Sequence, residues 1–192
     1  MIEIEIKAWL NKVNKKDLLN LIDAEGFIKD EEAFSEDIYY NHPDNDFKKS
    51  DEALRIRKVK NHNHQESFIT YKGPKKNSVS VTRFEAETKI EDPAIMDNIL
   101  TSLGFKKANP LKKKRLTLNS SPKYKNINIC LDKVYGIGDF IEIEKLSPDN
   151  TPKKKQEAIL NELFTLLKIL KVPEENLTTD SYLDILSNFT LF

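Results

Sequence analysis

The stretch Ile2-Glu3-Ile4-Glu5-Ile6-Lys7 alternates strictly between isoleucine and charged residues. Successive side chains of a β-strand point to opposite faces, so the pattern predicts a strand with one apolar face and one charged face. The charged face holds Glu3, Glu5 and Lys7. Taken alone, such a face can simply be exposed to solvent, as on one side of an antiparallel sheet. The return of the pattern later in the chain favours a functional role.

The charged alternation recurs at Glu85-Ala86-Glu87-Thr88-Lys89 and again at Glu142-Ile143-Glu144-Lys145. A helical pattern that ends in Gly-Phe follows each of the first two copies, at Gly26-Phe27 and at Gly104-Phe105. We therefore interpret residues 1–192 as a single domain made of two related halves, about residues 1–80 and 81–192.

Length, charge and cysteine content exclude several classes of protein. The chain has 192 residues, enough for one domain with a sizeable core. Lys plus Arg and Asp plus Glu each number 31, so the net charge is zero and a general attraction to nucleic acid is not indicated. No apolar run approaches the ~20 residues that cross a bilayer, and no export signal is recognisable. The single Cys130 excludes an internal disulfide.

We therefore expect a cytoplasmic protein that binds neither nucleic acid nor membrane. The oligomeric state stays open at this point, a homodimer included.

The order of the predicted elements favours an antiparallel α+β domain. About eight strands are expected, at residues 2–9, from 37 to a turn at 43, and at 53–58, 67–72, 81–90, 112–119, 127–134 and 140–145. Helices are expected at residues 14–25, from 92 to a stop at 104, from 151 to about 171, and around 180–186. A basic loop is expected at residues 75–80.

Two of these helices carry clear apolar stripes. The helix that begins at Asp92 has its stripe at Ile95, Ile99, Leu100 and Leu103. The long helix is capped by Thr151-Pro152, and its stripe is Ile159, Leu160, Leu163, Leu167 and Leu170. Helices of this kind are expected to cover the apolar face of the sheet.

The charged face of the sheet must then be open to water or wrapped on itself. Strands between the acidic ones carry cations, namely Arg55 with Arg57, Lys72, and Lys113 with Arg115. Because unpaired buried charges are costly, a wrapped sheet of this kind needs water, metal and ligand inside it. A hydrophilic tunnel with helices on the outer face of the sheet is consistent with this pattern, which leaves the closure of the sheet open. The interior of such a tunnel suits a polyanion together with a divalent metal.

Five motifs in order carry a family resemblance over nearly the whole chain. They are Glu-x-Glu-x-Lys at 3–7, YYNHPDNDFKKSDEALRIRK at 39–58, TYKGP at 70–74, CLDKVYGIGDFIEIEK at 130–145 and SYLDIL at 181–186. The chain resembles the CYTH superfamily of triphosphate tunnel metalloenzymes, and the NHP, DEALRIR and KGP stretches resemble its class IV adenylyl cyclase branch. The resemblance implies an α+β fold, an eight-stranded antiparallel β tunnel or barrel with helices packed on its outer face. It also implies that the tunnel binds a nucleoside triphosphate or tripolyphosphate with Mg²⁺ or Mn²⁺.

The resemblance also implies roles for individual residues. The expected metal ligands are Glu3, Glu5, Asp132, Glu142 and Glu144. The expected triphosphate contacts are Lys7, Arg55, Arg57, Lys72, Lys113 and Arg115. Within these two sets, the expected catalytic residues are Glu5, Lys72 and Arg115. Glu85 and Glu87 either complete the metal shell or pair with neighbouring cations, and Tyr39 either orients the substrate or is an ordinary strand aromatic.

Two departures from the family pattern keep the reaction open. Only Met1 and Ile2 precede Glu3, where some class IV cyclases carry an additional His-Phe element, and Leu118 stands where the family often has an aromatic residue. In an adenylyl cyclase the ribose 3′-hydroxyl attacks the α-phosphorus of ATP, which yields cyclic AMP and pyrophosphate. In an inorganic or organic triphosphatase, such as one for thiamine triphosphate, water attacks the terminal phosphorus. The third alternative is a non-catalytic triphosphate-binding protein.

Overall fold

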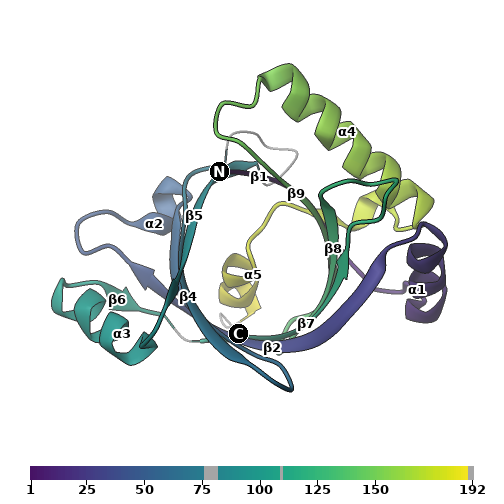
Figure 1. The fold of residues 1–192 in the computed structure, drawn as a ribbon. Helices are drawn as coiled ribbons and strands as arrows, with labels where there is room; N and C mark the ends of the chain where they lie inside the picture. Colours follow the sequence, from purple (N-terminus) through teal and green to yellow (C-terminus); the bar gives the residue numbers. More distant parts are fainter. Residues whose placement is uncertain (76–81, 109, 190–192) are drawn as a thin grey trace.

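The computed structural model describes residues 1–75, 82–108 and 110–189. Within this part of the chain, eight long strands form one closed antiparallel barrel (Figure 1). They are β1 (Ile2–Trp9), β2 (Ile28–Asn41), β3 (Ala53–Lys60), β4 (Gln65–Lys72), β5 (Arg83–Ile90), β7 (Leu111–Asn119), β8 (Ile127–Val134) and β9 (Gly138–Ser147). Two short strands, β6 (Lys106–Lys107) and β10 (Leu177–Thr178), pair with β2 and β1. The predicted fold class is confirmed.

β1 closes the ring because it pairs on both of its edges. Its pairing with β9 runs over the whole strand, from Ile2 opposite Ser147 to Trp9 opposite Phe140. Its pairing with β5 is much shorter and joins Ile2 to Phe84 and Glu3 to Arg83. The barrel therefore has one long seam and one short seam on the two sides of its first strand.

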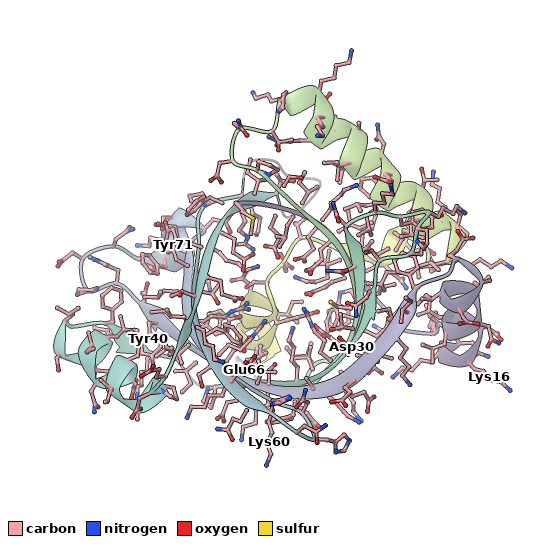
Figure 2. The ribbon with its side chains drawn as sticks, viewed as in Figure 1. Lys16, Asp30, Tyr40, Lys60, Glu66 and Tyr71 are labelled. Carbon is pink, nitrogen blue, oxygen red and sulfur yellow. The ribbon has the colours of Figure 1, made fainter. Side chains whose placement is uncertain are left out.

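The strand register places the charged side chains inside the barrel. Glu5 lies opposite Glu144 on β9, and Arg115 of β7 lies opposite Asp132 on β8. Residues that are opposite each other in an antiparallel pair share a face of the sheet. Side chains from around the ring point into its interior, whereas the labelled Lys16 lies outside on a helix (Figure 2). The predicted alternation of faces is thus what separates the cavity from the core.

The main hydrophobic core lies between the outer face of the barrel and two helices, α1 (Lys15–Ala24) and α4 (Lys153–Ile169). Asn14 caps α1 by accepting hydrogen bonds from the backbone of its first turn, and Gly26 follows the helix with φ of 81°. A glycine is favoured there because this left-handed conformation strains other residues. The core side chains are mainly Ile4, Ile6, Leu18, Ile22, Ile127, Ile129, Ile141, Ile143, Leu163, Leu166 and Leu167.

The stripe predicted for α4 is confirmed, and the helix begins directly after the predicted Thr151-Pro152, but neither residue gives it a side-chain cap. Ile159, Leu163, Leu167 and Leu170 are buried, and Leu160 packs against them from a half-buried position. The N-cap residue is Pro152, which has no side-chain hydrogen bond to offer. The hydroxyl of Thr151 instead donates to the carbonyl of Pro148 at 2.7 Å in the preceding turn.

The stripe predicted for α3 (Pro93–Ser102) is wrong for three of its four residues. Ile95, Ile99 and Leu103 are 59%, 46% and 64% exposed, and only Leu100 of the predicted set is buried. The helix carries two overlapping apolar stripes, and it buries the one that runs through Met96 and Leu100. That orientation lets the neighbouring Asp97 accept a hydrogen bond from Tyr40 of β2 at 2.6 Å. The periodicity alone does not distinguish the two faces.

β2 begins at Ile28, nine residues before the predicted start at Asp37. The added segment is largely charged and exposed on its outer side, so its sequence lacks the apolar alternation that identifies a strand. It is held by β7, with a bulge between Lys29 and Glu32. Outside the barrel, Glu32 forms an ion pair with Lys114 of β7. The predicted basic loop at 75–80 falls almost entirely on residues 76–81, which lie outside the described residues.

The short helices lie near one end of the barrel. α2 (Phe47–Ser50) lies between β2 and β3. α5 (Tyr182–Phe189) lies across the ring rather than on its outer wall (Figure 1). Tyr182 and Ile185 of α5 pack against inward-facing apolar residues of three strands, Leu111, Val134 and Phe140. Among the described residues, no helix combines the length and hydropathy that a membrane span requires.

Candidate functional site

The barrel encloses a cavity of about 700 Å³. Almost every site residue predicted from the sequence contributes to its lining. These residues are Glu3, Glu5, Lys7, Tyr39, Arg55, Arg57, Lys72, Glu85, Glu87, Lys113, Arg115, Glu142 and Glu144. Asp132 is the exception, because it is 2% exposed and covered by the side chains of Lys113 and Arg115. With Asp132 included, the predicted residues come from all eight long strands, so only the closed barrel brings them together.

Three carboxylates form a compact cluster on the wall made by β1 and β9. One oxygen from each of Glu3, Glu5 and Glu144 lies within 4.8 Å of the other two. Glu3 and Glu5 are only 5% and 4% exposed. Burial, together with the neighbouring Glu142 and Glu3, raises the pKa of Glu5. Burial also raises the pKa of Glu144 to about 7, against the opposing charge of Arg115 and with smaller contributions from Glu3 and Glu5.

These three residues fit a divalent metal. Oε1 of Glu5 has no hydrogen-bond partner among the described residues, although it is buried. Nζ of Lys7 is 3.5 Å from this oxygen, close enough for an ion pair but without hydrogen-bond geometry. Buried carboxylates that repel one another and converge on one point are stabilised by a hard cation such as Mg²⁺ or Mn²⁺. The cluster contains three of the five predicted metal ligands.

The other two predicted metal ligands, Asp132 and Glu142, are engaged by cations. Arg115 donates from Nε and Nη2 to the two oxygens of Asp132 at 2.7 and 2.6 Å, and its Nη2 also contacts Glu142. Nζ of Lys113 donates to Asp132 at 2.7 Å. Burial opposes ionisation of both carboxyls, but Arg115 and Lys113 hold the pKa of each below its usual range. In this arrangement the two carboxylates orient cations, and a metal-binding role for them stays a prediction.

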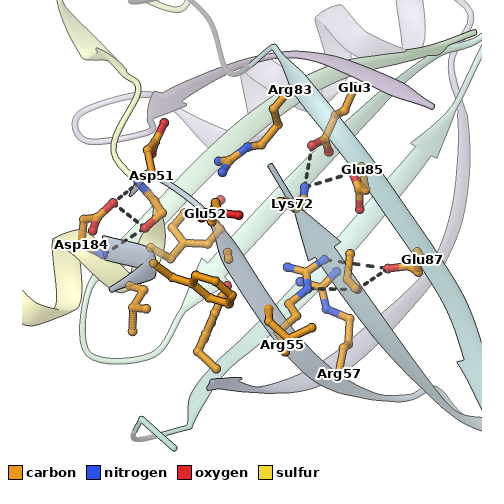
Figure 3. A pocket seen from close by; sticks show the side chains of 18 of the residues that line it. Glu3, Asp51, Glu52, Arg55, Arg57, Lys72, Arg83, Glu85, Glu87 and Asp184 are labelled. Carbon is orange, nitrogen blue, oxygen red and sulfur yellow. Dashed lines mark hydrogen bonds and ion pairs between the residues drawn. The ribbon is translucent and has the colours of Figure 1, made fainter. Parts of the chain in front are cut away.

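Glu85 and Glu87 lie on β5, the neighbour of β1 on its other edge, beside cations. Lys72 lies between Glu3 and Glu85, with its Nζ 2.5 Å from one carboxylate and 3.1 Å from the other (Figure 3). Glu87 accepts a hydrogen bond from the hydroxyl of Thr70 at 2.7 Å and lies 4.0 Å from Arg55. Of the two alternatives drawn from the sequence, the observed contacts match pairing with neighbouring cations.

Tyr39 is half-buried and lies opposite Arg55 in the register of β2 and β3. Its ring packs against the apolar cluster around α5. Tyr39 therefore lies where the cavity meets the end of the barrel that α5 covers.

Sequence reasoning missed the partner of two arginines. Asp37 is 1% exposed and accepts hydrogen bonds from Nε and Nη2 of Arg57 at 2.7 and 2.6 Å, with Arg55 at 3.4 Å. Burial opposes ionisation of Asp37, but these guanidinium groups hold its pKa well below the usual range. The signal was present, because Asp37 alternates with Tyr39 on a strand that faces the arginines.

Arg83 is the second residue that was missed. It is 6% exposed, lines the cavity near Glu3 (Figure 3), and its Nε has no hydrogen-bond partner among the described residues. Its alternation with Glu85 and Glu87 places it on the charged face of β5 and could have identified it.

Comparisons with known proteins agree with this geometry. The sequence model of the CYTH domain matches residues 1–182. A protein of Methanocaldococcus jannaschii named "Putative adenylate cyclase" is 40% identical over 185 residues, which cover 96% of this chain and 98% of that protein. The solved structure of the PH1819 protein from Pyrococcus horikoshii OT3 has a TM-score of 0.85 at 36% identity and covers 97% of this chain and 98% of its own.

A more distant structure comes from Hippeastrum. Its title describes a putative adenylyl cyclase with a dominant triphosphatase activity. It has a TM-score of 0.63 at 18% identity and covers 100% of this chain and 97% of its own. At this identity the similarity supports the fold alone.

Proposed function

The chain belongs to the CYTH family, and on that premise we propose that it is a divalent-metal-dependent enzyme that converts ATP to cyclic AMP and pyrophosphate. One observation carries the proposal. A cluster of three carboxylates and six predicted phosphate-binding cations face the same enclosed cavity. A polyanion with a divalent ion satisfies both sets of charges at once, whereas either partner alone leaves one set uncompensated.

The cations are suited to different parts of a triphosphate. Arg55, Arg57 and Arg115 offer planar guanidinium groups that can donate two parallel hydrogen bonds to a phosphate. Lys72 and Lys113 offer compact charges. Their carboxylate partners, above all Asp37 and Asp132, keep the long side chains in place before the substrate arrives. This arrangement lowers the ordering cost of binding.

The proposed metal ligands are Glu3, Glu5 and Glu144. A bound Mg²⁺ or Mn²⁺ would supply positive charge for the phosphate oxygens and for the attacking hydroxyl. The chain itself holds the reacting groups. Arg115 and Lys72 would stabilise the negative charge that develops on the α-phosphoryl group and on the leaving pyrophosphate. Glu5 contributes through the cluster that it forms with Glu3 and Glu144.

A triphosphatase is the second candidate, because the departures from the family pattern before Glu3 and at Leu118 leave the reaction open. The Hippeastrum protein, whose title describes a dominant triphosphatase activity, shares the fold. The same cavity would serve a water molecule that attacks the terminal phosphorus. We place the cyclase first because the M. jannaschii relative, at 40% identity, carries the cyclase name and because the NHP, DEALRIR and KGP stretches resemble the cyclase branch. Binding without turnover is the remaining alternative.

The reaction is tested by the products formed from ATP with Mg²⁺ or Mn²⁺, resolved by chromatography. Cyclisation yields cyclic AMP and pyrophosphate, and hydrolysis at the terminal phosphorus yields ADP and orthophosphate. Inorganic tripolyphosphate is the second substrate, because it lacks a ribose hydroxyl and can only be hydrolysed. Rapid tripolyphosphate hydrolysis without cyclic AMP would assign the protein as a triphosphatase. Binding without any product would assign it as a triphosphate-binding protein.

A further inference from the structure

Tyr182, the first residue of α5, contacts three charged residues of the cavity wall. Its ring centroid lies 4.6 Å from Nζ of Lys7 and 5.3 Å from Nζ of Lys113. Its hydroxyl donates to Asp132 at 3.1 Å. Two residues earlier, the carbonyl of Asp180 accepts a hydrogen bond from Nζ of Lys7 at 3.3 Å. The beginning of α5 thus gathers two lysines that come from different strands.

These two lysines are the most deeply buried cations of the predicted set. Lys7 is 5% exposed and Lys113 is 2% exposed. A carboxylate beside a buried ammonium group stabilises it but also neutralises it. The face of an aromatic ring attracts an ammonium group through its quadrupole and carries no net charge. Carboxylates already lie beside both ammonium groups, Asp132 at 2.7 Å from Nζ of Lys113 and Glu5 at 3.5 Å from Nζ of Lys7. The ring of Tyr182 adds a contact that holds both lysines near each other without neutralising their charge further.

The tyrosine itself is held firmly. The ring of Phe140 packs against it edge-on, with the centroids 4.8 Å apart, and Ile185 belongs to the same buried cluster. The turn before the helix is fixed by Ser181 and Asp184. The hydroxyl of Ser181 donates to Asp184 at 2.6 Å, and the backbone N–H of Asp184 donates back to that hydroxyl at 3.1 Å. Reciprocal contacts of this type fix the start of a helix.

We propose that Tyr182 is a positioning residue that holds the ammonium groups of Lys7 and Lys113 for the phosphates of the substrate. The inference rests on the proposed triphosphate site and adds a part to it that comes from the C-terminal helix. In this arrangement α5 builds one end of the phosphate site, in addition to covering the barrel.

The test compares Tyr182→Leu and Tyr182→Phe with the wild-type protein. Calorimetry measures the binding of tripolyphosphate with Mg²⁺ and, separately, the binding of Mn²⁺ alone. Tyr182→Leu removes the ring, and we expect it to weaken tripolyphosphate binding roughly tenfold while Mn²⁺ binding is unchanged. Tyr182→Phe keeps the ring and should stay within about threefold of wild type, since it loses only one of the hydrogen bonds to Asp132.

Ile185→Val is the matched control, because it trims the same apolar cluster and touches neither lysine. It should lower Tm slightly and leave tripolyphosphate binding at the wild-type value. Tyr182→Met is a second ring-free variant of larger volume, to be used if Tyr182→Leu does not fold. Wild-type affinity in the ring-free variant would overturn the proposal, as would an equal loss in Ile185→Val, which would reduce Tyr182 to packing. Absence of tripolyphosphate binding by the wild-type protein would instead overturn the triphosphate site itself.

Discussion

Glu5 and Glu144 lie directly opposite each other in the register of β1 and β9, on the inner face of the barrel. Like charges at opposed positions of an antiparallel pair destabilise the sheet. Here the destabilisation falls on the strand pair that forms the long seam of the barrel. The opposed carboxylates therefore disfavour this strand pairing, and a bound cation would relieve the repulsion.

Glu144→Gln should raise the stability of the metal-free protein by about 1 kcal/mol, since it removes one of the opposed charges. The same variant should lose most of the stabilisation that Mn²⁺ gives the wild-type protein. Urea unfolding with and without Mn²⁺ measures both effects. Glu157→Gln, which changes an exposed carboxylate on α4, is the control and should change neither value. A metal-free Glu144→Gln protein less stable than wild type would contradict the repulsion described above.

Asp37→Asn should destabilise the protein by about 3 kcal/mol or more near neutral pH, because it leaves two buried guanidinium groups without their carboxylate. The folded-state pKa of Asp37 is depressed, so its contribution is fully present above the unfolded-state pKa near 4 and is lost as pH falls below that value. The difference in unfolding free energy between the two proteins should be constant from about pH 5 to 8. It should shrink below about pH 4, as measured by urea unfolding across the pH range. A difference that is already small at pH 6 would show that the ion pair contributes little.

Arg115→Lys should lower kcat/KM about 100-fold on whichever triphosphate proves to be the substrate, because a lysine cannot reproduce the guanidinium fork. Circular dichroism should show that the variant still folds. The control is Lys114→Met on the same strand, whose side chain faces outward and pairs with the exposed Glu32. Steady-state kinetics should give Lys114→Met the wild-type rate. A similar rate for Arg115→Lys would remove Arg115 from the catalytic residues.

Two adjacent residues of α3, one exposed and one buried, should respond differently to substitution. Ile99→Lys should change the free energy of unfolding by no more than about 0.5 kcal/mol, because the side chain faces solvent. Leu100→Ala should cost about 2–3 kcal/mol, because the side chain is buried against β2 and β3. Thermal and urea unfolding compare the two directly. Equal destabilisation would mean that both stripes of the helix are covered in solution.

The alternation of apolar and charged residues predicted a sheet with one apolar and one charged face, and the family resemblance supplied its closure into a barrel. Each strand with this pattern can satisfy both of its faces only when one face packs on helices and the other encloses polar groups. Alternation does not predict which charges pair, because pairing depends on strand order and register. Asp37 and Asp132 were therefore not recognised as the carboxylates that hold Arg57 and Arg115.

Contacts between segments far apart in the chain also could not be predicted from the sequence. Tyr182 reaches Lys7 across more than 170 residues of chain, and only the folded barrel puts the end of α5 beside β1. The buried face of α3 was missed for a different reason. Its two apolar stripes are equally helical in spacing. The one that is buried packs against Tyr40 and Ile56, beside the hydrogen bond from Tyr40 to Asp97.

The unequal seams of β1 have a consequence for how the barrel moves. The β1–β9 pairing extends over eight residue pairs, whereas the β1–β5 pairing joins two among the described residues. Breathing of the ring should therefore begin between β1 and β5, where the fewest backbone hydrogen bonds must break. The carboxylate cluster lies on β1 and β9, the strands joined by the long seam. Lys72 of β4 forms an ion pair with Glu3 across the short seam. This ion pair would hold β1 against β4 and β5 and so oppose the separation of β1 from β5.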